Sequence, residues 1–261
     1  MFVNKHTINT INTINTINTI NTINTINTIN TINQLTEAEK NIEKKAAAER
    51  AAEFVKDGMI VGLGSGSTVF FAIKKIGELV RTGLNIKAVS TSDGTTQLAE
   101  SEGIKLISID DVEEIDLTID GADEVDRSFN GIKGGGGALL FEKIVALGSK
   151  KNIWIVDSAK LVDKLGKFPL PVEVIPFGYK RVFKIIDDMK LNPVIRKKGN
   201  DLYFTDSGNL IFDLHIGEIN DPVNMNVELK LINGIVETGL FINIADVVIA
   251  GKNNSTEIIN K

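Results

Sequence analysis

The sequence predicts an α/β protein with a mainly parallel sheet flanked by helices and a smaller α+β lobe inserted near the carboxyl end. Between residues 59 and 160, short apolar runs of strand-like composition alternate with segments of helical spacing, which is typical of parallel strands joined by helices. From residue 168 the pattern changes to short strands, turns and prolines, which indicates antiparallel strands. A chain of 261 residues, 43% of them hydrophobic, can bury the cores of two lobes.

The amino-terminal segment is dominated by a repeat. Residues 7–33 are nine copies of Thr-Ile-Asn. A period of three matches neither strand alternation nor the helical turn, so it builds no one-sided apolar face. We therefore expect residues 1–33 to be a disordered low-complexity extension. The alternative is a β-prone segment that associates with itself, because Ile and Thr favour strands and Asn can form ladders.

The folded part is expected to begin at residue 34 with a helix. Thr36 and Glu39 have the spacing of a capping box at a helix amino terminus. An Ala-, Glu- and Lys-rich run then predicts a helix over 38–55, which an Asp-Gly pair ends. The expected elements that follow are strand 59–64, helix 69–80, strand 86–92, helix 95–102, strand 105–109, strand 117–120, a helix from 138 and strand 152–160.

The inserted lobe begins where the prolines gather. Four of the five prolines lie between residues 169 and 193. The expected order there is strand 172–177, helix 181–189, strands 193–197, 202–206 and 209–216, and helix 225–232. A Ser-Gly-Asn turn at 207–209 predicts a hairpin. A buried run over 239–251 is expected to return to the first sheet as a strand.

These patterns divide the chain into three parts. Residues 1–33 form the extension. Residues 34–167 and 236–261 form the large domain, which we expect to be Rossmann-like. Residues 168–235 form the small α+β domain, expected to be ferredoxin-like.

Composition excludes several classes of function. The net charge of −5 argues against nucleic acid as the main partner, because phosphate backbones demand basic surface. The absence of cysteine excludes disulfides and thiolate metal sites. The only histidines are His6 and His215, and we expect His215 to be a structural residue of a strand. No apolar run approaches the ~20 residues that a membrane span needs, so the sequence predicts a soluble protein.

The densest chemistry lies in residues 116–146. Asp120 ends a predicted strand, Asp123 follows it, and Lys133 precedes four consecutive glycines at 134–137. Each glycine costs backbone entropy, so a run of four suits a backbone that must approach a ligand closely with its N–H groups. Ligands of open α/β sheets bind beyond the carboxyl ends of the strands. This stretch is therefore the predicted active site.

A second loop fits an anionic ligand. A strand, a Gly/Ser/Thr loop over 62–68 and a helix follow one another, an order that presents N–H groups and hydroxyls to an anion. The loop lacks the lysine of a P-loop and the third glycine of the dinucleotide motif, so a small phosphate ester fits better than a nucleotide. An ordinary tight turn is the alternative. Lys160, at the end of a predicted strand, is either a phosphate contact or a solvated lysine.

The pattern suits a base-catalysed proton shift next to a carbonyl. Such a reaction needs a carboxylate, a cation for the developing oxyanion and a group that moves protons between oxygens. Glu142 can serve as the carboxylate, Lys133 as the cation, and Asp120 and Asp123 in proton transfer. Taken alone, these residues indicate an enzyme that acts on a small phosphorylated metabolite.

Three other interpretations remain open at this point. Glu142 beside Lys143 can be an ordinary exposed helix pair. Asp120 and Asp123 can simply cap a turn. Asp120, Asp123 and Glu124 can bind magnesium, because hard oxygen ligands suit that ion.

Five motifs resemble ribose-5-phosphate isomerase type A, and the resemblance spans about residues 36 to 258. These motifs are GLGSGSTV (62–69), STSDGTT (90–96), TIDGADEVD (118–126), IKGGGGALLFEKIVA (132–146) and VDSAKLVDKLGKFPLPVEVIP (156–176). The resemblance implies that Glu142 is the base that moves a proton between C1 and C2, and that Asp120, Asp123 and Lys133 line the catalytic pocket. The substrate-binding residues that it implies are Ser65, Gly66, Ser67, Thr68, Gly134, Gly135, Gly136 and Lys160.

This chain departs from the family pattern at two positions. Ser65 stands where many members have threonine, which keeps the hydroxyl. Gly137 stands where many have alanine, which we expect to loosen the glycine run.

The resemblance also implies an activity and its setting. It implies an aldose–ketose isomerase that interconverts D-ribose 5-phosphate and D-ribulose 5-phosphate through a cis-enediolate, in the non-oxidative pentose phosphate pathway. It implies no metal or organic cofactor, a homodimer or tetramer, and a cytoplasmic location. The alternatives are a non-catalytic sugar-phosphate sensor, against which the lack of a basic DNA-binding segment weighs, and a coenzyme A transferase-like or amino-sugar-phosphate deaminase activity.

Overall fold

The structure is a computed structural model that describes residues 19, 35–253 and 255–261. It divides into two compact units, Met1–Glu39 and Lys40–Lys261. The expectation for residues 1–33 falls almost entirely outside the described residues. The architecture below is that of the second unit, with the helix that leads into it.

The helix α2 (Glu37–Ala52) confirms the predicted capping box. The backbone N–H of Thr36 donates to Oε2 of Glu39 at 2.8 Å, and the N–H of Glu39 donates to Oγ1 of Thr36 at 3.2 Å. Two N–H groups that a helix start leaves without partners are thereby satisfied.

The main sheet has seven strands, in the order β16-β15-β7-β4-β1-β2-β3. All neighbouring pairs are parallel except β15 with β16. Their bounds are β1 (Ile60–Leu63), β2 (Lys87–Ser90), β3 (Lys105–Leu106), β4 (Leu117–Gly121), β7 (Asn152–Asp157), β15 (Val247–Lys252) and β16 (Ser255–Asn260). The chain lays strands on one side of β1 and then on the other, so β1 and β4 form a topological switch point. The predicted parallel sheet is confirmed.

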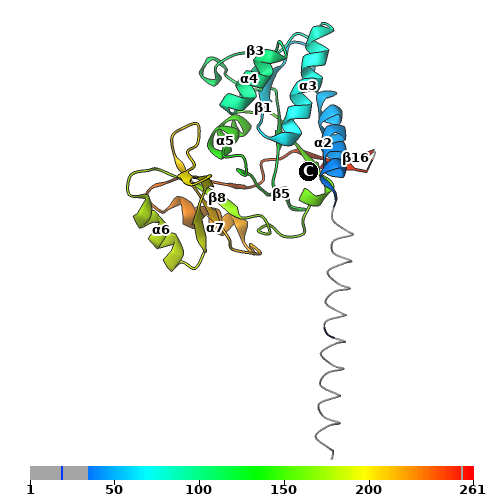
Figure 1. The fold of residues 1–261 in the computed structure, drawn as a ribbon. Coiled ribbons are helices and arrows are strands. Elements are labelled where there is room, and N and C mark those ends of the chain that lie inside the picture. Colours follow the sequence, from blue (N-terminus) through cyan, green and yellow to red (C-terminus); the bar gives the residue numbers. More distant parts are fainter. Residues whose placement is uncertain (1–18, 20–34, 254) are drawn as a thin grey trace, which may run out of the picture. The chain divides into compact units, whose positions relative to one another are not determined.

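Helices cover this sheet. They are α3 (Ser67–Arg81), α4 (Asp93–Ser101) and α5 (Leu139–Leu147), with short 3-10 turns η1 (Ile109–Asp111) and η2 (Ser158–Lys160). The predicted apolar side of α3 is buried at Val69, Ile73 and Ile76, which pack in one cluster with residues of α2 and of the sheet. α3 and α4 lie side by side (Figure 1).

A second, antiparallel sheet is built from the carboxyl-terminal part of the chain, in the order β13-β8-β12-β9. Its strands are β8 (Leu170–Val174), β9 (Pro193–Ile195), β12 (Leu210–Leu214) and β13 (Ile235–Thr238), and its helices are α6 (Tyr179–Asp188) and α7 (Pro222–Lys230). Val172, Phe212 and Ile186 are in its core. Shorter strands are β5 (Glu124–Val125), β6 (Gly131–Ile132), β10 (Lys197–Lys198), β11 (Asp201–Leu202) and β14 (Leu240–Phe241). The exact division into two domains stays a prediction.

Several sequence-based strand predictions were wrong in detail. The strands predicted over 105–109 and 152–160 end earlier, at Leu106 and Asp157. The run 239–251 is not one strand: β14 pairs with β6, and only β15 joins the main sheet. Asn243 between them has φ 58°, a left-handed conformation that interrupts a regular strand. The strand predicted over 202–206 ends at Leu202, and His215 lies exposed beyond the end of β12.

Candidate active site

The loops that follow β1 and β4 meet at the switch point. Oδ1 of Asp120 accepts hydrogen bonds from the backbone N–H of Ser65 at 3.2 Å and of Gly121 at 2.7 Å. A Cβ at Gly64 would lie 1.9 Å from that oxygen, so only glycine allows the loop to come this close. One aspartate thus holds the Gly/Ser/Thr loop and the end of β4 together.

A buried lysine links two of the three predicted acids. Nζ of Lys133 lies 2.9 Å from Oδ2 of Asp120 and 3.1 Å from Oε2 of Glu142, and it donates to the carbonyl of Gly121 at 2.5 Å. The exposed fractions of Lys133, Asp120 and Glu142 are 2%, 1% and 5%. The structure therefore places one ammonium between two carboxylates, nearly out of contact with bulk water.

This environment changes the acidity of all three groups. Burial, followed by the negative charge of Asp120, raises the pKa of Glu142 to about 8. Burial also raises the pKa of Asp120 above its usual value, and Lys133 only partly opposes this. Burial alone would lower the pKa of Lys133, but the charges of Asp120 and Glu142 outweigh it and raise that pKa. Glu142 is therefore poised to take up and release a proton near neutral pH.

The interpretation of Glu142 and Lys143 as an exposed helix pair is wrong. Both side chains are buried, and they point to different partners. Nζ of Lys143 lies 2.9 Å from Oε1 of Glu237 and donates to the carbonyls of Thr238 and Leu240. Lys143 is thus held by the segment around β13, which leaves Glu142 to face Lys133.

These groups border a cavity of about 250 Å³. It is lined by Lys44, Ser65, Gly66, Ser67, Thr68, Gly121, Ala122, Asp123, Lys133, Gly134, Gly135, Gly136, Glu142 and Lys160. Of the twelve residues predicted for the site, only Asp120 does not line the cavity, because it lies behind Lys133. Lys44 lines it without having been predicted, since a lysine on a helix of Ala, Glu and Lys carries no local signal of its role.

Asp123 lines the cavity and holds the glycine run. Its Oδ2 accepts the backbone N–H of Gly135 at 2.8 Å. Its neighbour Glu124 turns elsewhere and accepts the N–H groups of Gly166 and Phe168 at 2.6 and 2.7 Å. The magnesium interpretation therefore loses a ligand, and the described residues contain no group of three or more acidic, histidine or cysteine side chains placed to hold a metal ion.

The Gly/Ser/Thr loop is supported from the next strand. Oγ of Ser65 lies 2.7 Å from Oγ of Ser92 and 2.9 Å from Oγ1 of Thr91. α3 begins at Ser67, so its unpaired first-turn N–H groups and the hydroxyls of Ser67 and Thr68 meet at the cavity wall. This arrangement is suited to a phosphate group.

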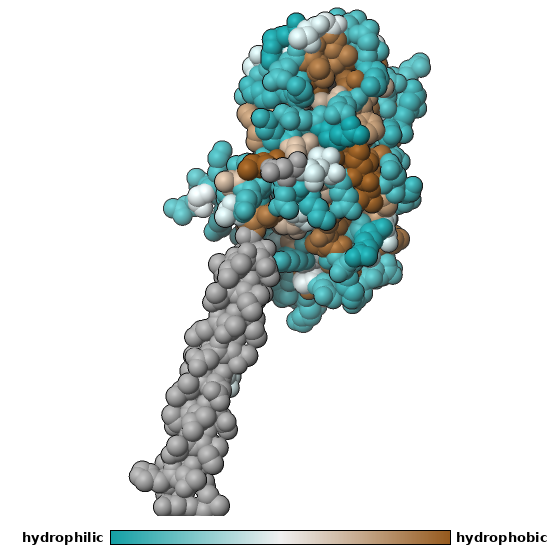
Figure 2. Space-filling view, turned by 90° about the vertical axis from the view of Figure 1, so that its right-hand side faces the viewer, coloured by the Kyte–Doolittle hydropathy of each residue, from teal (hydrophilic) through white to brown (hydrophobic). Residues whose placement is uncertain are grey.

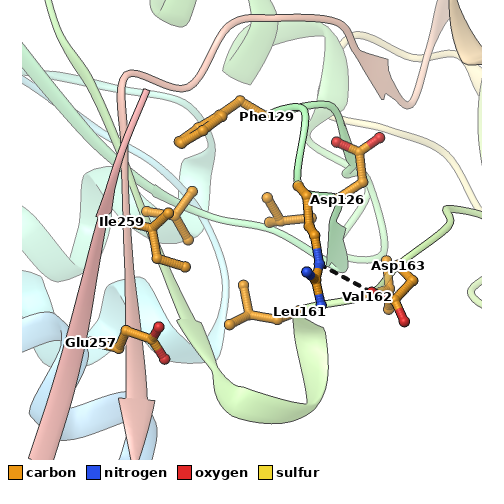
Figure 3. A pocket seen from close by; sticks show the side chains of 10 residues that line it. Asp126, Phe129, Leu161, Val162, Asp163, Glu257 and Ile259 are labelled. Atoms are coloured by element: carbon orange, nitrogen blue, oxygen red, sulfur yellow. Dashed lines mark ion pairs between the residues drawn. The ribbon is translucent and has the colours of Figure 1, made fainter.

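A larger cavity, of about 650 Å³, lies elsewhere and is mostly apolar. Figure 3 shows Phe129, Leu161 and Ile259 around it, and its dashed line marks an ion pair of Asp163. The partner of Asp163 is Arg127, whose Nε lies 3.1 Å from Oδ1 of Asp163. Arg127 and Asp163 are both largely exposed, so this ion pair is screened by water. The cavity contains no counterpart of the buried Lys133 group, and we assign the chemistry to the smaller one.

Comparisons with known proteins agree with this geometry. Residues 87–255 match the family model of ribose 5-phosphate isomerase A, also described as phosphoriboisomerase A. The chain belongs to this family. It is 49% identical over 221 residues to ribose-5-phosphate isomerase A of Listeria monocytogenes serotype 4b, covering 84% of this chain and 99% of that protein. The corresponding protein of Bifidobacterium adolescentis is 49% identical over 228 residues, covering 87% and 98%.

Solved structures of the family have the same fold. Ribose 5-phosphate isomerase A of Methanocaldococcus jannaschii superposes with a TM-score of 0.79 at 37% identity, over 84% of this chain and 98% of that one. A D-ribose-5-phosphate isomerase solved in complex with phospho-erythronic acid superposes with a TM-score of 0.81 at 40% identity, over 84% and 97%.

Proposed function

We propose that this chain is an isomerase that interconverts D-ribose 5-phosphate and D-ribulose 5-phosphate through a cis-enediolate. The observation that carries the proposal is the pairing of Glu142 with Lys133 at the wall of a cavity that also contains hydroxyls and lysines. Membership of the isomerase family gives the substrate. The proposed setting, the non-oxidative pentose phosphate pathway in the cytoplasm, rests on the family resemblance.

Glu142 acts as the base in this proposal. Ionised Glu142 takes the proton from C2 of the open-chain aldose, the C2 electron pair forms the C1–C2 double bond, and the carbonyl electrons move to O1. Lys133 stabilises the negative oxygen. Protonated Glu142 then returns its proton to C1, while Asp123 carries the proton of the C2 hydroxyl to O1. Asp120 acts through Lys133, which it holds in place, and through its charge, which raises the pKa of Glu142.

The phosphate lies at the other end of the cavity. C1 and C2 must be at Glu142, so a five-carbon chain places its phosphate several bonds away. Lys160 and Lys44 supply positive charge there, and Ser67 and Thr68 supply hydroxyls and N–H groups. Gly134 to Gly136 border the sugar.

The experiment is the conversion of ribose 5-phosphate in chelator-treated buffer, measured from pH 6 to 9. Because the base must be ionised and burial raises the pKa of Glu142 to about 8, we expect kcat/KM to rise with pH up to about 8 and to level off above it. Asp120 and Glu142 interact closely, so this limb belongs to the pair. A limb near the ordinary glutamate pKa would contradict the assignment of the base. A parent protein that binds the sugar phosphate without converting it would be a sensor.

We also propose that the chain forms a homo-oligomer. The surface seen in Figure 2 is mostly hydrophilic, with hydrophobic patches between. Val223, Val227 and Leu231 are spaced four apart along α7 and its end, and they are 53%, 52% and 78% exposed, an apolar stripe that a second copy can cover. Light scattering at micromolar concentration tests this, and a monomeric mass would contradict it.

In the part of the chain that the structure describes, every helix is too short or too polar to cross a membrane.

A further inference from the structure

An arginine outside the cavity holds the glycine run by hydrogen bonds to two of its carbonyl groups. Nη1 of Arg196 donates to the carbonyl oxygens of Gly134 at 2.8 Å and of Gly135 at 3.1 Å. Arg196 follows β9 in the antiparallel sheet and does not line the cavity. The contact therefore joins the second sheet to the candidate active site across 62 positions of sequence.

The direction of each carbonyl decides the direction of the next N–H. In a trans peptide the C=O of one residue and the N–H of the next point to opposite sides. Because Arg196 holds the Gly134 carbonyl, the N–H of Gly135 points to the opposite side, where it donates to Oδ2 of Asp123 at 2.8 Å. In the same way, the hydrogen bond from Arg196 to the Gly135 carbonyl leaves the N–H of Gly136 pointing away from Arg196.

That last N–H group is free for a ligand. Gly136 lines the cavity, and its N–H donates to no acceptor within the described part of the chain. Its own carbonyl accepts a hydrogen bond from the hydroxyl of Tyr203 at 3.3 Å. A group that holds these carbonyls would thus aim one donor at the substrate and another at Asp123.

We infer that Arg196 is a positioning residue for the isomerisation, which acts by orienting the peptides of Gly134 and Gly135. This inference rests on the proposed function and extends it to the residue that follows β9 of the other sheet. Arg196 keeps Asp123 fixed through the N–H of Gly135. It also aims the N–H of Gly136 at an oxygen of the reacting sugar. A donor aimed in advance needs no reorganisation when charge develops.

Arginine is required for this role because its planar guanidinium group donates hydrogen bonds to a carboxylate and to two carbonyls at once. Nε and Nη2 of Arg196 donate to the carboxylate of Asp213 at 2.9 and 2.5 Å, which fixes the plane of the guanidinium. Nη1 then points at the two carbonyls. A lysine offers one ammonium without this planar geometry, so it cannot hold the carboxylate and both carbonyls together. The side chains of Arg196 and Asp213 are only 15% and 19% exposed, so water does not readily replace the contacts.

The hydroxyl of Tyr203 completes the support. A Cβ at Gly137 would lie 2.1 Å from this hydroxyl. The hydroxyl of Tyr203 therefore occupies the space that a methyl group at this position would need. The expectation that Gly137 loosens the run stays a prediction, and the side chain that occupies this space follows β11 of the two-stranded sheet.

The test compares Arg196→Lys and Arg196→Gln with the parent protein. We expect kcat to fall about tenfold or more. This decrease should be smaller than the decrease caused by removing an oxyanion donor entirely, because the N–H of Gly136 stays present but is no longer held toward the substrate. We also expect inhibition by phospho-erythronic acid, whose carboxylate can take the place of the enediolate, to weaken by a similar factor. Inhibition by inorganic phosphate should stay unchanged, because the lysines and the Ser67 loop hold that group.

Arg81→Lys is the matched control. Arg81 also pairs with a largely buried carboxylate, Glu102 at 2.7 Å, but lies away from the cavity, so its kcat should equal that of the parent.

The outcomes separate the two proposals. A parent protein without activity on ribose 5-phosphate overturns the proposed function itself. An active parent with Arg196 variants of equal kcat overturns the positioning role. An equal loss of inhibition by phosphate and by phospho-erythronic acid, or a failure of both Arg196 variants to fold, would assign Arg196 to general stability and also overturn it.

Discussion

Replacing Glu142 with glutamine is expected to lower kcat for ribose 5-phosphate by about 10² or more, the contribution that a positioned acid–base group makes. The substitution keeps the shape of the side chain and an oxygen that can face Lys133, now 3.1 Å from the carboxylate. It removes the only carboxylate that both lines the cavity and has its pKa raised to about 8 among the described residues. The measurement is the initial rate of ribulose 5-phosphate formation in chelator-treated buffer above pH 8, where Glu142 of the parent is mostly ionised.

Glu237→Gln is the matched control for this variant. Glu237 forms an ion pair of 2.9 Å with Lys143, and Lys143 follows Glu142 on the same helix. Glu237 itself does not line the cavity. Its substitution should leave kcat close to the parent value. If Glu142→Gln is as active as the parent, the base lies elsewhere and Asp123 becomes the candidate, with Asp120 behind it. If Glu237→Gln loses as much activity as Glu142→Gln, the loss reports a disturbed helix and not a missing base.

Replacing Lys133 with methionine is expected to reduce both activity and stability. The ammonium that faces the developing oxyanion is removed, and loss of one such group costs about 10²–10³ in kcat. Asp120 and Glu142, both buried, lose their shared cation. Removing one partner of a buried ion pair costs about 3–5 kcal/mol when a buried charge is left behind. Here a carboxylate can take up a proton and reduce that cost.

The effect of Lys133 on the protonation of Glu142 predicts the direction in which the acid limb of kcat/KM shifts. Without Lys133, the charged form of Glu142 is less favoured, so its pKa rises and the acid limb of kcat/KM should move to higher pH than in the parent. Lys160→Met serves for comparison, because Lys160 also lines the cavity but at the proposed phosphate end. That variant should mainly raise KM and leave the acid limb in place. An acid limb unchanged in Lys133→Met would show that Lys133 does not control the ionisation of the base.

Much of the fold could be predicted because it depends on local pattern. The capping box of Thr36 and Glu39, the apolar side of α3 and the alternation of strands and helices are each set by residues a few positions apart. Where a strand depended on its partner, prediction was weaker. The run 239–251 is apolar throughout, yet it serves two different sheets.

The sequence by itself determined the candidate chemistry: a base, a lysine and a glycine run lie within one stretch, next to a strand end. Only the tertiary structure decided how these groups act. The order of β1 and β4 brings Asp120 to the Ser65 loop and hides it behind Lys133. The burial of that group, and the hydrogen bonds from Arg196 to Gly134, join segments far apart in the chain. Such contacts follow from the packing of whole elements, which no local spacing encodes, and packing also sets the low dielectric that raises the pKa of Glu142.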